Sequence, residues 1–217
     1  MCRSKLIRDS KNISRYVDKN GVLVKNTWIT YKEKKYYFDK NGHALKGMKK
    51  VGKNYYYFQA KYGYMMRHVR YMNSRNDVYY FGGDGIMVKK VFYTWSGNNE
   101  SHTYYFTASG RACRSWLRHD GKKYYFDSNG LMQRGMIPLN GKIYLFGADG
   151  AMQYGFYSDP TAGTRYFKTD GSMAANELLT VGTNKYYFNT NGVMATGLTN
   201  IGGVTYLFGA DGAMQYG

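Results

Sequence analysis

Aromatic residues recur along this chain of 217 residues, which contains 25 Tyr, 11 Phe and 3 Trp. The segment KYYF occurs at residues 35–38, 123–126 and 185–188. The flat ring of Tyr or Trp can lie against the C–H face of a pyranose, while its polar edge forms hydrogen bonds. The spacing therefore predicts several similar saccharide-binding surfaces instead of one reaction centre.

The middle residue of each such segment should face away from the Phe that follows it, because side chains alternate along a strand. We expect this outward set, with two Trp near the longest repeat unit, to contact ligand. The candidates are Tyr37, Tyr80, Tyr105, Tyr125, Tyr166, Tyr187, Trp95 and Trp116. Packing between neighbouring segments is the alternative role, and we expect it for most of the inward-facing Tyr.

Motifs that would indicate an enzyme are missing. The four His residues fall at different phases of the pattern, and no HExxH, GxSxG or P-loop spacing accompanies them. The 14 acidic residues fall mostly in turn positions, where they cap the backbone. Cys2 and Cys113 show no CxxC spacing. We expect no catalytic residue, no metal site and no cofactor.

A glycine marks each of ten repeat units, at intervals of 20 to 25 residues. The marker glycines are Gly21, Gly42, Gly63, Gly85, Gly110, Gly130, Gly150, Gly171, Gly192 and Gly212. Phe stands four residues before the glycine in eight units, and Met follows two residues after it in most. Such regular repetition is typical of a solenoid. We expect the Met side chains to fill gaps between units.

The unit at 135–155, GMIPLNGKIYLFGADGAMQYG, predicts a β-hairpin. Residues 136–139 form the first strand, Asn140-Gly141 a two-residue turn, and residues 142–146 the second strand. A single hairpin cannot bury its aromatic face, but stacked hairpins can. We therefore predict an all-β, elongated β-solenoid of about ten hairpins, with no helix. Longer arms are expected at 94–103 and 158–164.

Twelve residues, YLFGADGAMQYG, occur at 144–155 and again at 206–217, which is 62 residues or three units later. If the stack has three hairpins per turn, units one turn apart have the same neighbours. Such a stack would favour a sequence period of three units. Duplication of a three-unit block is the alternative explanation.

The segments GKKYYFDSNGLMQRG (121–135) and NKYYFNTNGVMATG (184–197) resemble the cell-wall-binding and glucan-binding repeats of Gram-positive bacteria. Such repeats occur in choline-binding proteins, streptococcal glucansucrases and clostridial toxins. The resemblance implies a non-catalytic targeting module over residues 13–217, with residues 1–12 as a cap or truncation junction. It also implies a catalytic or toxin domain on the same full-length chain and a secreted or cell-surface location. The start of the chain shows no signal peptide.

Choline-binding repeats carry a Gly-Trp pair and a second Trp directly before Tyr-Tyr. Here the first of these positions holds Met48, Val91, Met136, Phe156 and Leu198, and only Trp116 matches. We include Phe156 among the ligand-binding candidates. The second position holds Lys35, Lys123 and Lys185 in three units, and an ammonium group there would repel choline. The departures favour a carbohydrate ligand, either a cell-wall polysaccharide or a glucan.

The formal net charge of +17 is uneven, because residues 1–110 contain 21 of the 31 Lys and Arg and only 7 of the 14 Asp and Glu. A basic half predicts a polyanionic neighbour such as teichoic acid, although it also suits a well-solvated surface. A structural spacer or adhesin stalk is a further alternative. We expect neither specific nucleic-acid binding nor membrane insertion.

Overall fold

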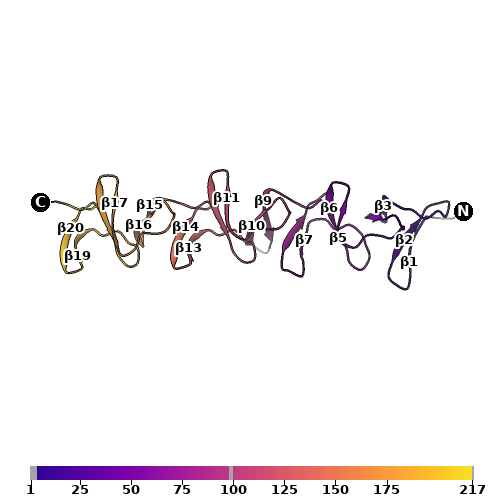
Figure 1. Cartoon of the computed structure of the whole chain (residues 1–217), viewed down its shortest axis with the longest axis horizontal. Coiled ribbons are helices and arrows are strands. Elements are labelled where there is room, and N and C mark those ends of the chain that lie inside the picture. The colour runs from indigo at the N-terminus through magenta and orange to yellow at the C-terminus, as the bar shows by residue number, and fades with distance from the viewer. Residues whose placement is uncertain (1–3, 98–99, 217) are drawn as a thin grey trace. The chain divides into compact units, whose positions relative to one another are not determined.

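The computed structural model describes residues 4–97 and 100–216, and these form ten antiparallel hairpins in series. The chain divides into two compact parts, residues 1–113 and 114–217, which we call the N-terminal and C-terminal parts. Within each part the hairpins follow one another in chain order (Figure 1). The predicted all-β class and the series of ten hairpins are confirmed. The predicted number of hairpins per turn stays a prediction.

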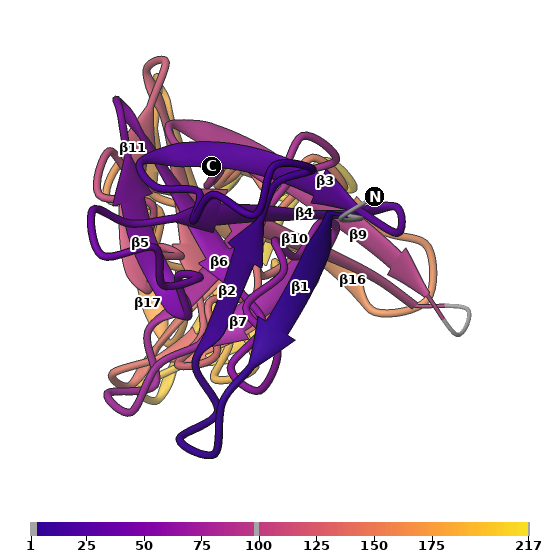
Figure 2. The ribbon, with the colours of Figure 1, turned by 90° about the vertical axis from the view of Figure 1, so that its right-hand side faces the viewer.

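The N-terminal part contains five hairpins. Their strands are β1 (Lys5–Arg8), β2 (Ser14–Val17), β3 (Thr27–Tyr31), β4 (Lys34–Phe38), β5 (Gly47–Val51), β6 (Asn54–Phe58), β7 (Val69–Met72), β8 (Val78–Phe81), β9 (Val91–Gly97) and β10 (Glu100–Phe106). The first three hairpins run in different directions when viewed from the N-terminal end (Figure 2). The expected boundary between residues 12 and 13 falls in the turn of the first hairpin.

The C-terminal part contains five more hairpins. Their strands are β11 (Ser115–His119), β12 (Lys122–Phe126), β13 (Gly135–Leu139), β14 (Lys142–Phe146), β15 (Gly155–Asp159), β16 (Gly163–Phe167), β17 (Glu177–Val181), β18 (Asn184–Phe188), β19 (Gly197–Ile201) and β20 (Val204–Phe208). Within the described ranges of both parts, no helix is long and apolar enough to cross a bilayer.

The two-residue turns have the backbone that their sequences predict. Asn140 and Gly141 join β13 to β14 with φ angles of 50° and 75°. Positive φ at both central residues matches the right-handed twist of the two strands, and Asn-Gly adopts it at low cost. The predicted strands at 136–139 and 142–146 are therefore confirmed to within one residue.

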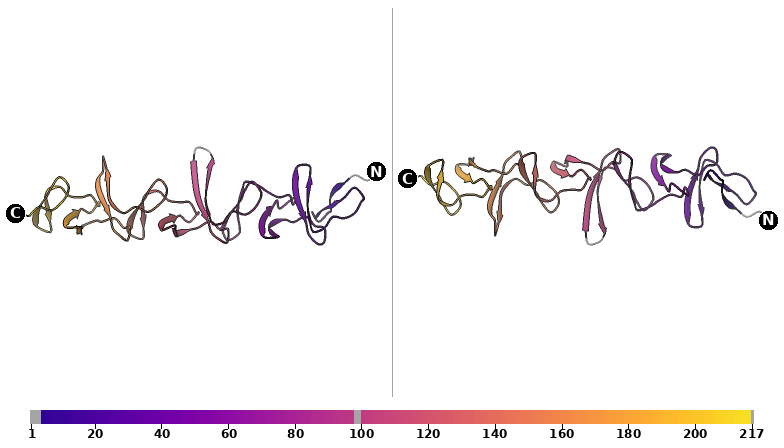
Figure 3. Two further views of the ribbon diagram at one scale, coloured as in Figure 1. Left: turned by 90° about the horizontal axis from the view of Figure 1, so that it is seen from above. Right: turned by 90° about the horizontal axis from the view of Figure 1, so that it is seen from below.

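The two longer arms have different causes. In the fifth hairpin, β9 and β10 are seven residues each and project from the N-terminal part (Figure 3). In the eighth hairpin the strands have the usual five residues, and the extra length lies in the turn from Pro160 to Ala162. The Asp159 carboxylate caps that turn by accepting hydrogen bonds from the backbone N–H groups of Thr161 and Ala162, both at 2.9 Å.

The last residue of almost every second strand is a fully buried Phe. These residues form the centre of the core: Phe38, Phe58, Phe81, Phe106, Phe126, Phe146, Phe167, Phe188 and Phe208, all at most 1% exposed. The Tyr two positions earlier is buried on the same face in Tyr36, Tyr79 and Tyr124. The predicted inward face is therefore confirmed for the Phe residues and for these Tyr residues, whereas Tyr186 at the same position is only partly buried. Burial of these rings stabilises the stack.

The marker glycine is required because Met of the preceding unit lies directly against it. A Cβ at Gly150 would stand 2.5 Å from both Sδ and Cε of Met132. The φ of Gly150 is also +79°, a conformation that L-residues rarely adopt. The same pairing joins Gly171 to Met152. The expectation that Met fills gaps between units is confirmed.

Backbone hydrogen bonds connect successive units within each part. Met152 N donates to Lys123 O in β12 at 2.8 Å, while the next residue, Gln153, donates through its N–H to Leu145 O in β14 at 2.8 Å. The loop after one hairpin thus bonds both to its own hairpin and to the previous one. The same bridge is formed at Met65 and Met87 in the N-terminal part and at Met173, Met194 and Met214 in the C-terminal part.

Candidate aromatic binding clefts

Cross-strand pairing brings Trp116 of β11 opposite Tyr125 of β12, with ring centroids 5.1 Å apart. The next hairpin contributes Tyr144 of β14, whose ring centre lies 5.2 Å from that of Trp116. Both contacts are edge-to-face, a favourable geometry for aromatic pairs. Trp116 is still 41% exposed, so its ring remains open to a ligand.

The same three-ring arrangement occurs at two other hairpins. Trp28 lies 5.3 Å from Tyr37 and 4.9 Å from Tyr56, again between ring centroids. Phe156 lies 4.8 Å from Tyr166 and 5.1 Å from Tyr186. We call these groups the Trp28, Trp116 and Phe156 clusters. In each, two rings come from one hairpin and the third from the next, so a cluster forms only when hairpins stack.

Two clefts adjoin the exposed clusters of the C-terminal part. The cleft at Trp116 has a volume of about 480 Å³ and is also lined by Arg118, Lys123, Tyr144 and Asp170. The cleft at Phe156 has a volume of about 410 Å³. Its lining includes the exposed rings of Tyr154 and Tyr157 together with Gln153 and Arg134. Both combine aromatic faces with polar groups, and both have the size of a small-molecule site.

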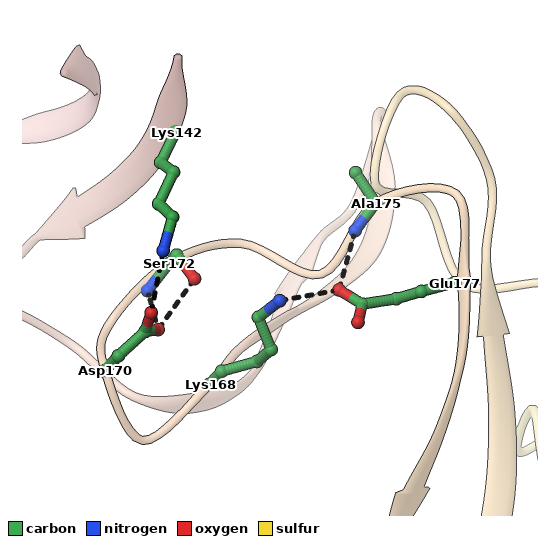
Figure 4. A network of polar contacts seen from close by, with 6 residues as sticks. All are labelled: Lys142, Lys168, Asp170, Ser172, Ala175 and Glu177. Carbon is green, nitrogen blue, oxygen red and sulfur yellow. Dashed lines mark hydrogen bonds and ion pairs between the residues drawn. The ribbon is translucent and has the colours of Figure 1, made fainter. Parts of the chain in front are cut away.

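An ionised carboxylate borders the Trp116 cleft. Asp170 accepts hydrogen bonds from Ser172 Oγ at 2.6 Å and from Ser172 N at 2.8 Å, and it pairs with Lys142 Nζ at 3.1 Å (Figure 4). The bonds from Ser172, followed by the contact with Lys142, hold the pKa of Asp170 well below its usual range. Asp170 is therefore a charged acceptor at neutral pH, suited to hydroxyl groups of a sugar.

Lys-to-acid contacts also link successive units along this part. Lys122 of β12 reaches Asp149 at 3.1 Å, just as Lys142 of β14 reaches Asp170. Figure 4 also shows Lys168 bound to Glu177 at 2.8 Å. These exposed pairs contribute little stability individually. The Lys122 and Lys142 contacts each join a loop to the hairpin that precedes it.

The Trp28 cluster differs because a cation of the chain covers it. Lys35 Nζ lies 4.8 Å from the centre of the Trp28 ring. Four other Lys and one Arg of the N-terminal part lie over Tyr rings at 4.4 to 5.8 Å. These ring faces already have a positively charged partner.

The predicted site residues fall into five groups. Trp116 with Tyr125, and Phe156 with Tyr166, lie in the two open clusters, whereas Tyr37 belongs to the covered Trp28 cluster. Tyr105 packs against Phe92, with centroids 5.0 Å apart. The hydroxyl group of Tyr187 donates to Asn176 Oδ1 at 3.2 Å. Tyr80 and Trp95 both line a separate cavity in the N-terminal part.

One expectation about an individual side chain is wrong. Tyr80, expected on the outward face, is only 6% exposed, because the ring of Tyr93 from the next, longer hairpin lies 4.1 Å from it, measured between centroids. The middle residue of β14, Leu145, is also only 6% exposed. The outward face of a strand is therefore covered wherever the following hairpin supplies a large side chain.

Sequence reasoning also missed residues that the structure brings into the clusters. Trp28 occupies the same register position as Trp116, because it also pairs with the middle Tyr of its hairpin. In the fifth hairpin the equivalent residue is Phe92 and not Val91. Counting back from the buried Phe would have found Trp28, which precedes Phe38 by the same ten residues that separate Trp116 from Phe126. In the parts of the chain that the structure describes, no three His, Cys, Asp or Glu side chains gather as metal ligands would.

The family described as "Putative cell wall binding repeat" matches residues 26–44, 115–132 and 176–194. Each match contains a KYYF segment and a marker glycine. Three of the ten hairpins therefore match this repeat model, namely β3–β4, β11–β12 and β17–β18.

Solved structures and a curated protein resemble these cell-wall-binding repeats. The choline-binding domain of CbpL from Streptococcus pneumoniae is 28% identical, with a TM-score of 0.66, over 88% of this chain and 97% of that one. Choline binding protein F from the same species shares the fold at 20% identity and a TM-score of 0.52, over 99% and 94% of the two chains. Glucosyltransferase-I of Streptococcus downei is 25% identical over 142 residues, which are 65% of this chain and 6% of that protein.

Proposed function

We propose that the chain is a non-catalytic module that binds a saccharide polymer, either of the bacterial cell wall or of an extracellular glucan, and keeps an attached domain there. The pair of open clefts at Trp116 and Phe156 carries this proposal. Each presents an exposed ring beside polar groups, which suits a pyranose. The family of the repeats supports a cell-surface location.

Repetition suits a polymeric ligand. A single shallow cleft binds weakly, but a second cleft on the same part meets a tethered stretch of the same polymer at high effective concentration. The Trp116 cleft is lined by residues of β11, β12 and β14, and the Phe156 cleft by residues of β13, β14, β15 and β16. We therefore expect a variant that lacks both rings to lose more affinity than the two single variants lose in total. Independent sites would give losses that simply add.

Co-sedimentation with purified Gram-positive cell walls and with insoluble α-glucan tests the proposal. The variant Trp116→Leu/Phe156→Leu removes both rings, and Leu already occupies the same position at Leu178 and Leu198. We expect a loss of retention of at least tenfold, because removing a central aromatic contact typically costs about 1–2 kcal/mol. Leu178→Ala is the matched control, since it removes an exposed apolar side chain without a ring.

Two results would overturn the proposal. One is wild-type protein that sediments with neither material. The other is a double variant retained as well as wild type. Repeating the assay at 0.5 M salt separates ring stacking from the binding of a polyanion by the basic half, because only the electrostatic mode should collapse.

Choline attached to a wall polymer is a second candidate ligand. The CbpL domain, 28% identical to this chain, is named for choline binding, and three rings around a cavity can attract a quaternary ammonium. However, Lys35 covers the Trp28 ring and Lys123 lines the Trp116 cleft. Competition by free choline against cell-wall retention separates the two candidates.

A further inference from the structure

A separate cavity of about 140 Å³ lies in the N-terminal part between the β7–β8 and β9–β10 hairpins. Tyr80, Tyr104 and Phe106 form its buried side, each at most 6% exposed. Arg70 and Trp95 also line it and are exposed, Trp95 by 52%. A cavity of about 150 Å³ can hold a benzene ring, which is smaller than a pyranose with its hydroxyl groups. Because Arg70 and Trp95 leave one side of the cavity exposed, the site can take one edge of a sugar residue while the rest of the sugar stays in solvent.

The register shows that this cavity corresponds to an aromatic cluster with one ring replaced. Arg70 pairs with Tyr80 across β7 and β8, just as Trp116 pairs with Tyr125. The next hairpin contributes Tyr104, two residues before its buried Phe, in the place of Tyr144. A guanidinium group thus stands where the Trp28 and Trp116 clusters present an indole.

Besides the exposed imidazole of His68, the polar groups that line the cavity can donate hydrogen bonds: the Arg70 guanidinium, the Tyr hydroxyls and the Trp95 indole N–H. The Tyr93 hydroxyl donates to the Tyr80 hydroxyl at 2.6 Å, so Tyr80 retains its own O–H for another acceptor. Burial raises the pKa of Tyr80 to about 12, so the phenol stays protonated. No carboxylate is among the described residues that line the cavity, and no side-chain hydrogen bond or ion pair in the described chain engages Arg70.

We propose that this cavity binds one pyranose that carries an anionic group, a carboxylate or a phosphate. The guanidinium of Arg70 receives the anion, which also accepts a hydrogen bond from Tyr80. The exposed indole of Trp95 lies against the sugar ring. A planar guanidinium forms paired hydrogen bonds with either anion, and these are stronger than bonds between neutral groups. This proposal depends on the proposed function in one respect only, which is that the ligand is a saccharide.

Titrations of the full chain with glucuronic acid, glucose 6-phosphate and glucose test the proposal, followed by the indole N–H resonance of Trp95 in NMR spectra. Trp95→Phe assigns that resonance. We expect both anionic sugars to shift the Trp95 resonance, and the one that binds more tightly identifies the preferred anion. Glucose should bind at least tenfold more weakly. Adding salt should weaken the anionic sugars more than glucose.

Arg70→Met is the decisive variant, because Met48 and Met136 occupy the same register position in other hairpins. It should lose at least tenfold in affinity for the anionic sugars and keep the wild-type melting temperature. Arg67→Gln, which removes an exposed charge that does not line the cavity, should bind as wild type does.

The proposal is overturned if Arg70→Met binds the anionic sugars as tightly as wild type, if glucose binds equally well, or if no sugar shifts the Trp95 resonance at 50 mM. Retention on walls or α-glucan through the Trp116 and Phe156 clefts should be unchanged in Arg70→Met. Failure of the anionic site and failure of the proposed function are therefore distinguishable.

Discussion

Lys35 Nζ lies 4.8 Å from the centre of the Trp28 ring. The two residues come from the paired strands β3 and β4, so the ammonium group is held over the indole by the hairpin itself. A cation in that position is attracted by the ring face, by about 0.5–1 kcal/mol at an exposed site. The chain thus supplies its own cation to the Trp28 cluster.

Replacing Lys35 should open the Trp28 cluster to external cations. Thr occupies the same position at Thr103, Thr164 and Thr205, which makes Lys35→Thr a change that the fold already tolerates. We expect wild type to show no choline-dependent change at Trp28, and Lys35→Thr to bind choline at millimolar concentration. Tryptophan fluorescence titration measures this. Lys34→Thr, in which Lys35 is kept, is the control; equal responses of the two variants would contradict the interpretation.

The buried Phe residues should dominate stability. Phe146→Ala removes a ring that is 1% exposed, and we expect a loss of about 3–5 kcal/mol in the free energy of unfolding in urea. Leu198→Ala, at a side chain that is 77% exposed, should change it by less than about 0.5 kcal/mol. Similar losses in the two variants would mean that the aromatic core is not what holds the hairpins together.

Two glycines with similar backbone angles should differ sharply in their tolerance of a methyl group. Gly141 has a φ of +75° with nothing within 4 Å of an added Cβ, so Gly141→Ala should cost only the backbone strain of about 1–2 kcal/mol. Gly150→Ala carries a similar strain and also collides with Met132, which should add about 1–3 kcal/mol.

Thermal or urea unfolding measures both glycine variants. Combining Gly150→Ala with Met132→Ala should cost less than the sum of the two single changes, because the shortened side chain removes the collision. Additive losses, or equal losses for the two glycines, would contradict the proposed contact between units.

Acid should weaken the loop at Asp170. Hydrogen bonds from Ser172, with help from Lys142, lower the pKa of this carboxyl in the folded chain. A lowered folded pKa means that the stabilisation is complete above the unfolded value of about 3.9 and is lost as the pH falls below it. Asn occupies the equivalent position at Asn129 and Asn191, so Asp170→Asn is a suitable comparison.

Melting temperatures of wild type and Asp170→Asn should differ most between pH 5 and 8 and converge between pH 4 and 2. The expected difference is small, because the Asp170 side chain is 53% exposed. A constant difference across the whole pH range would show that charge on Asp170 does not stabilise the fold.

Sequence alone predicted the hairpins because their determinants are local. Asn140-Gly141 specifies its turn, and alternation along β14 places Phe146 in the core. The clusters depend on two hairpins at once, and the sequence of one hairpin does not show what the next will cover. Tyr80 was therefore expected to be exposed and is buried beneath Tyr93.

The position of Trp28 could have been predicted, since it keeps the same spacing to its buried Phe as Trp116 does. The sequence also places the Lys35 ammonium group at the position where it would repel choline, but its location over the face of the Trp28 ring depends on the Lys rotamer. The position of Arg70 beside Tyr80 also required the structure, because it follows from the register of β7 and β8.

An NMR titration of the full chain with an isomalto-oligosaccharide, following the indole N–H resonances of Trp28 and Trp116, tests the central claim most directly. The claim is that stacked hairpins create aromatic clusters that bind saccharide where the ring is open. We expect the Trp116 resonance to shift with ligand concentration and the Lys35-covered Trp28 resonance to stay in place. Equal shifts at both indoles, or none at Trp116, would contradict the account.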